Sequence, residues 1–134
     1  MDIKKEKVLC QKQWAKNKYL VLSYSSKIYL EIRTYLKQEE VSLEKVNKLI
    51  KQAINLPEDK GQVTNALHHV WGYFKKFATK EEKDNFFEMI EDYHTNKTTK
   101  EDLIEEVKKL LEKYPNTYLE QSTFINGGKD ETLA

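Results

Sequence analysis

Side chains that could do chemistry interrupt the apolar row of the first predicted helix, at Lys18 and Ser25, and lie to one side of the apolar row of the third, at His69 and Tyr73. His69 could act as a general acid or base, with Lys18 and Tyr73 orienting a small substrate. Three hydroxyl groups could join them, at Tyr24, Ser25 and Tyr29. One hypothesis is therefore a polar cleft between helices that binds or converts a small molecule.

The same residues also have structural explanations. The methylene stem of Lys18 can lie along apolar surface while its amine reaches water, and Ser25 can donate to a carbonyl one turn earlier. A satisfied, partly buried histidine is the expected state of His68 and of His69. Adjacent residues on a helix do not face each other, so this pair predicts no metal site.

Known catalytic and cofactor motifs do not occur in the sequence. It contains no phosphate-binding glycine loop, no His-Glu-x-x-His, no Cys-x-x-Cys and no glycine-flanked serine nucleophile. The single cysteine, Cys10, cannot form an internal disulfide or hold a metal ion by itself. We expect neither a cofactor nor a metal, and the missing motifs argue against an enzyme.

The composition predicts one helical domain in the cytosol. The chain has 134 residues, of which 39% are apolar and 34% charged, with four glycines and two prolines. The sequence contains no run of 18 or more apolar residues, the length that a membrane-spanning helix needs. The first residues also lack the apolar stretch of a secretory signal.

Charge is balanced overall but uneven along the chain. The net charge of +1 excludes the strongly basic field of a dedicated nucleic-acid binder. Six lysines nevertheless crowd the first eighteen residues, at Lys4, Lys5, Lys7, Lys12, Lys16 and Lys18. This local basic patch could contact phosphate, although a lysine-rich helix also serves as a solvated face.

Apolar periodicity and capping residues predict five helices. The first covers about 8–37 without proline or glycine, and the second follows a Ser42 cap and stops before Pro57. Capping boxes begin the other three, at Asp59 with Gln62, Thr79 with Glu82 and Thr98 with Glu101. The third helix carries an apolar row that ends at Phe77, and Pro115 closes the fifth.

We therefore predict an all-α fold, a single-domain bundle of about five helices with a short C-terminal appendage. The domain is expected at 1–126 and a flexible tail at 127–134, where no apolar period continues. Gly72 lies inside the predicted third helix, at a cost of about 1 kcal/mol relative to alanine. Close approach of another helix, or of a ligand, would explain this glycine and would make the third helix the central one.

Four stretches of the chain carry a resemblance to a known family. They are Lys-Tyr-Leu-Val-Leu-Ser-Tyr-Ser at 18–25 followed by Tyr29, Asn-Ala-Leu-His-His-Val-Trp-Gly-Tyr-Phe at 65–74, Ile-Glu-Asp-Tyr at 90–93, and the segment 114–121. The most specific part is an Asn-x-x-x-His-x-x-Gly-Tyr-Phe pattern, at Asn65, His69, Gly72, Tyr73 and Phe74. Together these stretches resemble the YbgA family, a bacterial domain of unknown function.

The resemblance implies that five polar residues occupy positions typical of the family: Lys18, Ser25, His69, Tyr73 and Gln121. The sequence departs from the family at Tyr24, where members carry a histidine, and at 98–103, where they have an apolar stretch with proline. Members occur alone or fused behind a cysteine-rich desulfidase domain, which removes sulfur from thiolated uracil or from 4-thiouridine in transfer RNA. The resemblance therefore implies docking of RNA, or assistance to a separately encoded desulfidase-type partner.

Three functions follow from these observations. The first is a non-catalytic module that binds RNA through the patch at 4–18 and a groove between the first and third predicted helices. The aromatic residues that could stack a base there are Tyr24, Tyr29, Trp71 and Tyr73. The second is a protein-interaction or homodimerisation module with exposed aromatic residues, and the third is a small-molecule enzyme that uses His69.

Overall fold

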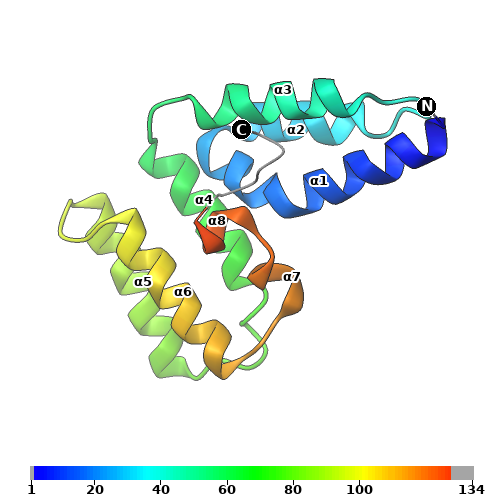
Figure 1. The fold of residues 1–134 in the computed structure, drawn as a ribbon. Helices are drawn as coiled ribbons and strands as arrows, with labels where there is room; N and C mark the ends of the chain where they lie inside the picture. Colours follow the sequence, from blue (N-terminus) through cyan, green and yellow to red (C-terminus); the bar gives the residue numbers. More distant parts are fainter. Residues whose placement is uncertain (1, 128–134) are drawn as a thin grey trace.

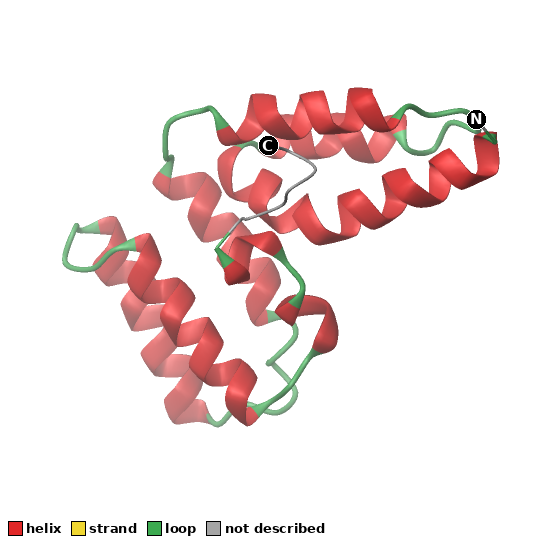
Figure 2. Ribbon diagram, in the orientation of Figure 1, coloured by secondary structure: helices red, strands yellow, loops and turns green. Residues whose placement is uncertain are grey.

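The computed structural model describes residues 2–127, and Figure 1 and Figure 2 show their arrangement. Eight helices and no strand occur in this range. The helices are α1 (Ile3–Tyr24), α2 (Ser26–Tyr35), α3 (Leu43–Ile54), α4 (Lys60–Trp71), α5 (Lys80–His94), α6 (Lys100–Lys113), α7 (Thr117–Glu120) and α8 (Thr123–Asn126). The all-α prediction is confirmed, but the number of helices was too low.

Apart from Gly127, the predicted tail at 127–134 lies outside the described residues. Within residues 2–127, no helix combines the length and the apolar character that a membrane span requires.

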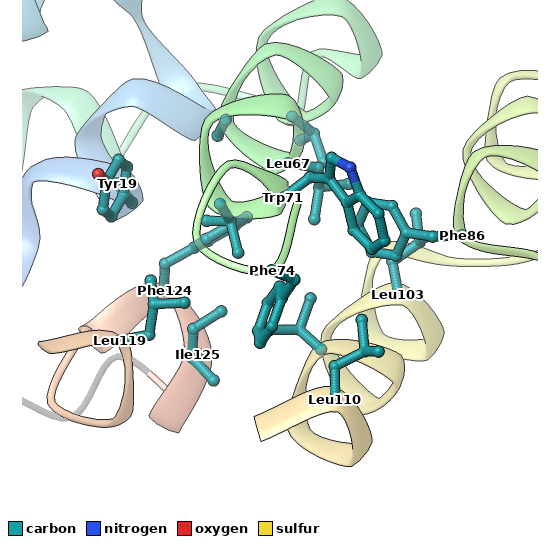
Figure 3. Close-up of a cluster of buried hydrophobic side chains, with 14 of the residues drawn as sticks. Tyr19, Leu67, Trp71, Phe74, Phe86, Leu103, Leu110, Leu119, Phe124 and Ile125 are labelled. Atoms are coloured by element: carbon teal, nitrogen blue, oxygen red, sulfur yellow. The ribbon is translucent and has the colours of Figure 1, made fainter. Parts of the chain in front are cut away.

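The helices surround two neighbouring cores. The first core lies between α1, α2 and α3 and includes Cys10 and Ile32. α4 packs against α1 and leads to the hairpin of α5 and α6 (Figure 1). The second core joins α1 and α4 to α5, α6, α7 and α8, and Figure 3 shows Trp71, Phe74 and Phe86 within it. Trp71 stacks on Phe86 with ring centroids 5.1 Å apart, which ties α4 to α5.

The predicted long first helix is two helices, because the chain breaks at Ser25. Ser25 has extended backbone (φ −159°, ψ 110°), and its hydroxyl accepts the Ile28 N–H at 3.0 Å as the N-cap of α2. The Ser26 N–H at the start of α2 donates to Gln62 Oε1 of α4 at 2.7 Å. The apolar spacing continues across this break, so periodicity alone could not reveal it.

Three of the predicted N-caps are confirmed, and one of them is only half of the predicted motif. Ser42 caps α3, Asp59 caps α4 and Thr79 caps α5. Thr79 and Glu82 form the full capping box, because each side chain accepts the other residue's N–H. Gln62 uses its side chain to hold the start of α2 and does not return to Asp59.

The predicted cap of α6 at Thr98 is wrong by one residue. Thr99 caps this helix and accepts the Asp102 N–H at 3.1 Å. Thr98 instead donates its hydroxyl to Asp102 Oδ2 at 2.8 Å. Hydrogen bonds from both threonines hold the pKa of Asp102 below its usual range. Adjacent threonines offer the same hydroxyl group, so the sequence could not choose between them.

α4 ends at Trp71, well before the predicted end of its apolar row. The chain continues in tight turns, in which the Phe74 N–H donates to Trp71 O at 2.9 Å. Phe74 still reaches the core, but Phe77 is 65% exposed, so the predicted row does not extend to it. Gly72 is the exposed C-cap of α4, and a Cβ there would meet only His69 O, at 3.1 Å. The predicted approach of another helix to Gly72 is therefore wrong.

Candidate functional site

A groove of about 310 Å³ lies between α1, α2 and α7, and we call it the cationic groove. Its lining residues are Gln11, Trp14, Ala15, Lys18, Arg33, Leu36, Lys37 and Tyr118. Three of these described residues are cationic, two are aromatic and none carries a carboxylate. The wall of the groove therefore combines positive charge with flat apolar surface.

Helical spacing and the break at Ser25 bring this wall together. The lining residues of α1 recur at steps of three and four, so they share one face of that helix. α2 packs against α1, and the rings of Trp14 and Tyr29 lie 5.2 Å apart at 50°. Arg33 follows Tyr29 by four residues and so lies one turn along the same face of α2.

Lys18 lies between two tyrosine rings. Its Nζ is 5.1 Å from the ring centroid of Tyr118 and 5.2 Å from that of Tyr19. Such cation–π contacts are worth about 0.5–1 kcal/mol each at exposed sites. Because Lys18 is half-buried and lines the groove, its stem packs on aromatic surface while its charge stays at the wall.

A tyrosine cluster supports Tyr118 from the protein side. The rings of Tyr73 and Tyr118 are stacked at 11°, with centroids 6.1 Å apart. The hydroxyl oxygens of Tyr73 and Tyr19 lie 2.8 Å apart. Burial, followed by the hydrogen bond to Tyr73, raises the pKa of Tyr19 far above its usual range. Tyr19 is therefore neutral, and its hydrogen bond to Tyr73 supports the cluster.

The structure brings some of the predicted site residues together. Lys18 lines the cationic groove, Tyr73 supports it through Tyr118, and Tyr29 supports it through Trp14. The predicted groove between the first and third helices corresponds to the α1–α4 contact, where buried side chains of the second core are packed.

Tyr24 and Ser25 lie elsewhere. The Tyr24 ring is 5.3 Å from Lys100 Nζ, in a separate depression of about 390 Å³ that Leu20 and Phe124 also line. Ser25 is occupied as the N-cap of α2. Neither residue lines the cationic groove.

The remaining predicted residues are exposed. Asn65, His69 and Gly72 are exposed on α4 or at its end, and Gln121 is the exposed C-cap of α7. None of the four lines the cationic groove, and their part in binding stays a prediction.

The expectation of partly buried histidines is wrong. Both His68 and His69 are exposed, although the His68 ring lies 5.2 Å from that of Phe87. Within the described part of the chain, no group of three or more His, Cys, Asp or Glu side chains could hold a metal ion.

Sequence reasoning missed Arg33, Lys37 and Tyr118. The two cations stand four residues apart around the end of α2, which is a signal of a shared face. Tyr118 falls in the segment 114–121, which carried the family resemblance without a role. Neither signal predicts that these residues lie near Lys18, because that depends on the break at Ser25, which places α2 beside α1.

The fold and the groove together define the chain as an all-helical protein with a cationic groove lined by aromatic side chains. A family model described as "Protein of unknown function (DUF1722)" matches residues 18–127. The chain therefore belongs to the DUF1722 family. No curated protein and no solved structure matches the chain.

Proposed function

We propose that this chain is a non-catalytic RNA-binding module and that the cationic groove is its binding surface. The observation that carries the proposal is the composition of the groove wall, where Lys18, Arg33 and Lys37 stand beside Trp14 and Tyr118. RNA offers both complementary features, a phosphate backbone and flat bases.

Charge and aromatic surface support different parts of this interaction. Lysine and arginine neutralise phosphates without reading sequence, while an arginine fork can bond two phosphate oxygens at once. Base stacking on an aromatic ring contributes about 1–3 kcal/mol per base. Tyr118 is 36% exposed and is stacked on Tyr73, and the proposed base stacks against the exposed part of its ring.

The family resemblance indicates which class of RNA to test as the ligand. The matched DUF1722 model is consistent with the YbgA-like resemblance, whose members stand alone or are fused to a desulfidase-type domain. We therefore propose transfer RNA, and thiolated transfer RNA in particular, as the ligand to test first. In this view the module presents RNA to a desulfidase-type partner encoded separately.

The first experiment is binding of bulk transfer RNA, with and without 4-thiouridine, across a salt titration. If the three groove cations each neutralise one phosphate, the slope of log K against log salt should be about −2. Preference for the thiolated RNA would support the desulfidase connection. Absence of binding at low salt would overturn the proposed function.

Single neutral variants test whether the groove carries the binding. Arg33→Gln and Lys37→Gln should each weaken binding and make the slope shallower by about 0.7. The matched control is Lys48→Gln, because Lys48 is an exposed lysine of α3 that does not line the groove. Equal effects of all three variants would show a diffuse charge effect and contradict the proposed site.

One observation favours a second candidate, a homodimerisation or protein-interaction module. Phe77 is 65% exposed, which is unusual for so large an apolar ring. Light scattering at high micromolar concentration tests self-association. A dimer that Phe77→Ala dissociates would favour this second function.

A further inference from the structure

A second depression, of about 270 Å³, is also lined by aromatic side chains. Its lining residues are Tyr73, Phe77, Lys113, Tyr114, Pro115 and Asn116. The rings of Phe77 and Tyr114 are stacked at 23° with centroids 6.3 Å apart. Lys113 Nζ lies 5.5 Å from the Tyr114 ring centroid, so this depression also pairs a cation with rings.

Tyr73 connects this depression to the cationic groove. It lines the depression, and it stacks on Tyr118, which lines the groove. We use the name aromatic track for the five rings that line the two hollows: Trp14 and Tyr118 in the groove, and Tyr73, Tyr114 and Phe77 in the depression. The stacked pair of Tyr73 and Tyr118 therefore links the two hollows.

The far end of the track is held rigidly by Glu82. The Tyr114 hydroxyl donates to Glu82 Oε1 at 2.7 Å, and Lys113 Nζ lies 3.2 Å from Glu82 Oε2. Tyr114 is fixed, and Phe77 rests on it with an open outer face. Glu82 offsets the positive charge of Lys113 in this ion pair. The aromatic rings therefore contribute more than charge to any binding at this end.

Resting on the proposed function, we infer that the surface binds a single-stranded stretch of the RNA, which extends along the whole aromatic track. Its phosphates lie against the groove cations, one base stacks at Tyr118 and a later base stacks on Phe77. A duplex does not fit this surface, because the faces of paired bases are covered by their neighbours. The inference thus assigns Phe77 and Tyr114 as a second base-stacking subsite.

Length-dependent binding tests the second subsite. Fluorescence anisotropy compares labelled oligouridylates of about four and about twelve nucleotides, a range typical of single-strand binding sites. The long oligonucleotide should bind more tightly. Phe77→Ala should weaken it by about 5- to 150-fold, the equivalent of one stacked base, and leave the short one unchanged.

Two controls separate this subsite from other effects. Leu30→Ala removes an apolar side chain of similar exposure, 53%, from α2 outside both hollows, and should change neither affinity. Phe77→Ala should also leave the salt slope for the long oligonucleotide unchanged, whereas Lys37→Gln makes it shallower by about 0.7.

Each contrary outcome has its own meaning. Equal affinity for both lengths, no effect of Phe77→Ala, or tighter binding of a duplex of the same length overturns the second subsite and leaves the groove proposal standing. Failure of both oligonucleotides and of transfer RNA to bind overturns the proposed function itself. Conversion of a dimer to a monomer by Phe77→Ala would assign this ring to self-association and also overturn the inference.

Discussion

The hydroxyl oxygens of Tyr19 and Tyr73 lie 2.8 Å apart, and their hydrogen bond joins α1 to the turn that follows α4. The two rings meet edge to face, at 87° with centroids 6.1 Å apart. The ring of Tyr73 is also stacked with that of Tyr118. One hydrogen bond deep in the tyrosine cluster therefore fixes the position of a ring in the cationic groove.

The two partners of this bond should respond differently to loss of a hydroxyl. Tyr19 is buried, whereas Tyr73 is half-buried. Tyr73→Phe leaves a buried hydroxyl on Tyr19 without this partner and should cost about 1–3 kcal/mol, whereas Tyr19→Phe should cost about 0.5–1.5 kcal/mol. Urea unfolding of both single variants and the double variant measures the coupling. Equal costs in the two single variants would contradict the stated asymmetry of burial.

Neighbouring hydroxyls at the start of α8 make a second contrasting pair. Thr123 Oγ1 lies 2.8 Å from Asn17 Oδ1 and 3.1 Å from Lys16 O, in a buried contact with α1. The buried Ser122 Oγ has no hydrogen-bond partner among residues 2–127. Thr123→Val should therefore cost about 1–3 kcal/mol, whereas Ser122→Ala should be neutral or stabilising by up to about 1 kcal/mol. Thermal unfolding of the two variants compares them directly, and a destabilised Ser122→Ala would indicate a bonded hydroxyl.

The sequence predicted helical segments and their buried faces well where each depends on local pattern. The row Val63, Leu67, Val70 and Phe74 was predicted from spacing alone, and all four residues are buried. The cationic groove was beyond such reasoning because it depends on two long-range events. The break at Ser25 folds α2 back beside α1, and α7 brings Tyr118 against Lys18 from a hundred residues away in the chain. Neither event leaves a periodic signal.

The capping box of α5 should stabilise the protein at neutral pH and lose this effect at acid pH. The Thr79 N–H, then the Tyr114 hydroxyl and Lys113, lower the pKa of Glu82 from 4.5 to about 2. A carboxyl whose pKa is lowered by folding stabilises the protein above its unfolded pKa, and this stabilisation is lost as the pH falls through the folded pKa. The difference in melting temperature between the native protein and Glu82→Gln should therefore be constant above about pH 6. It should shrink between pH 4.5 and about 2.

The matched control for this pH series is Glu81→Gln. This change removes one carboxylate from the same first turn of α5 without touching the capping box. If both variants showed the same acid profile, the effect would belong to net charge and not to the contacts of Glu82.

Ser25 should prove to be a folding residue and not a binding residue. Its hydroxyl is occupied by the Ile28 N–H, and it does not line the cationic groove. Ser25→Ala should therefore destabilise the protein by about 1 kcal/mol, the usual cost of an N-cap, while Ser25→Asp retains the cap. At temperatures below the unfolding transition, the RNA affinity of the two variants should be the same. Loss of affinity in Ser25→Ala with rescue by Ser25→Asp would mean that the α1–α2 geometry controls the groove.

His69 provides the sharpest test between a binding surface and a catalytic cleft. It is exposed on α4 and does not line the cationic groove. His69→Gln should therefore change stability by less than about 0.5 kcal/mol and leave RNA affinity unchanged. Lys18→Met should weaken binding, because it removes the charge and keeps an unbranched apolar side chain. Both variants should be titrated with RNA from about pH 5 to 8, the range in which a histidine changes charge. If His69→Gln abolished a pH dependence that Lys18→Met retained, His69 would belong to the working site, and the enzyme hypothesis would take precedence over the RNA-binding one.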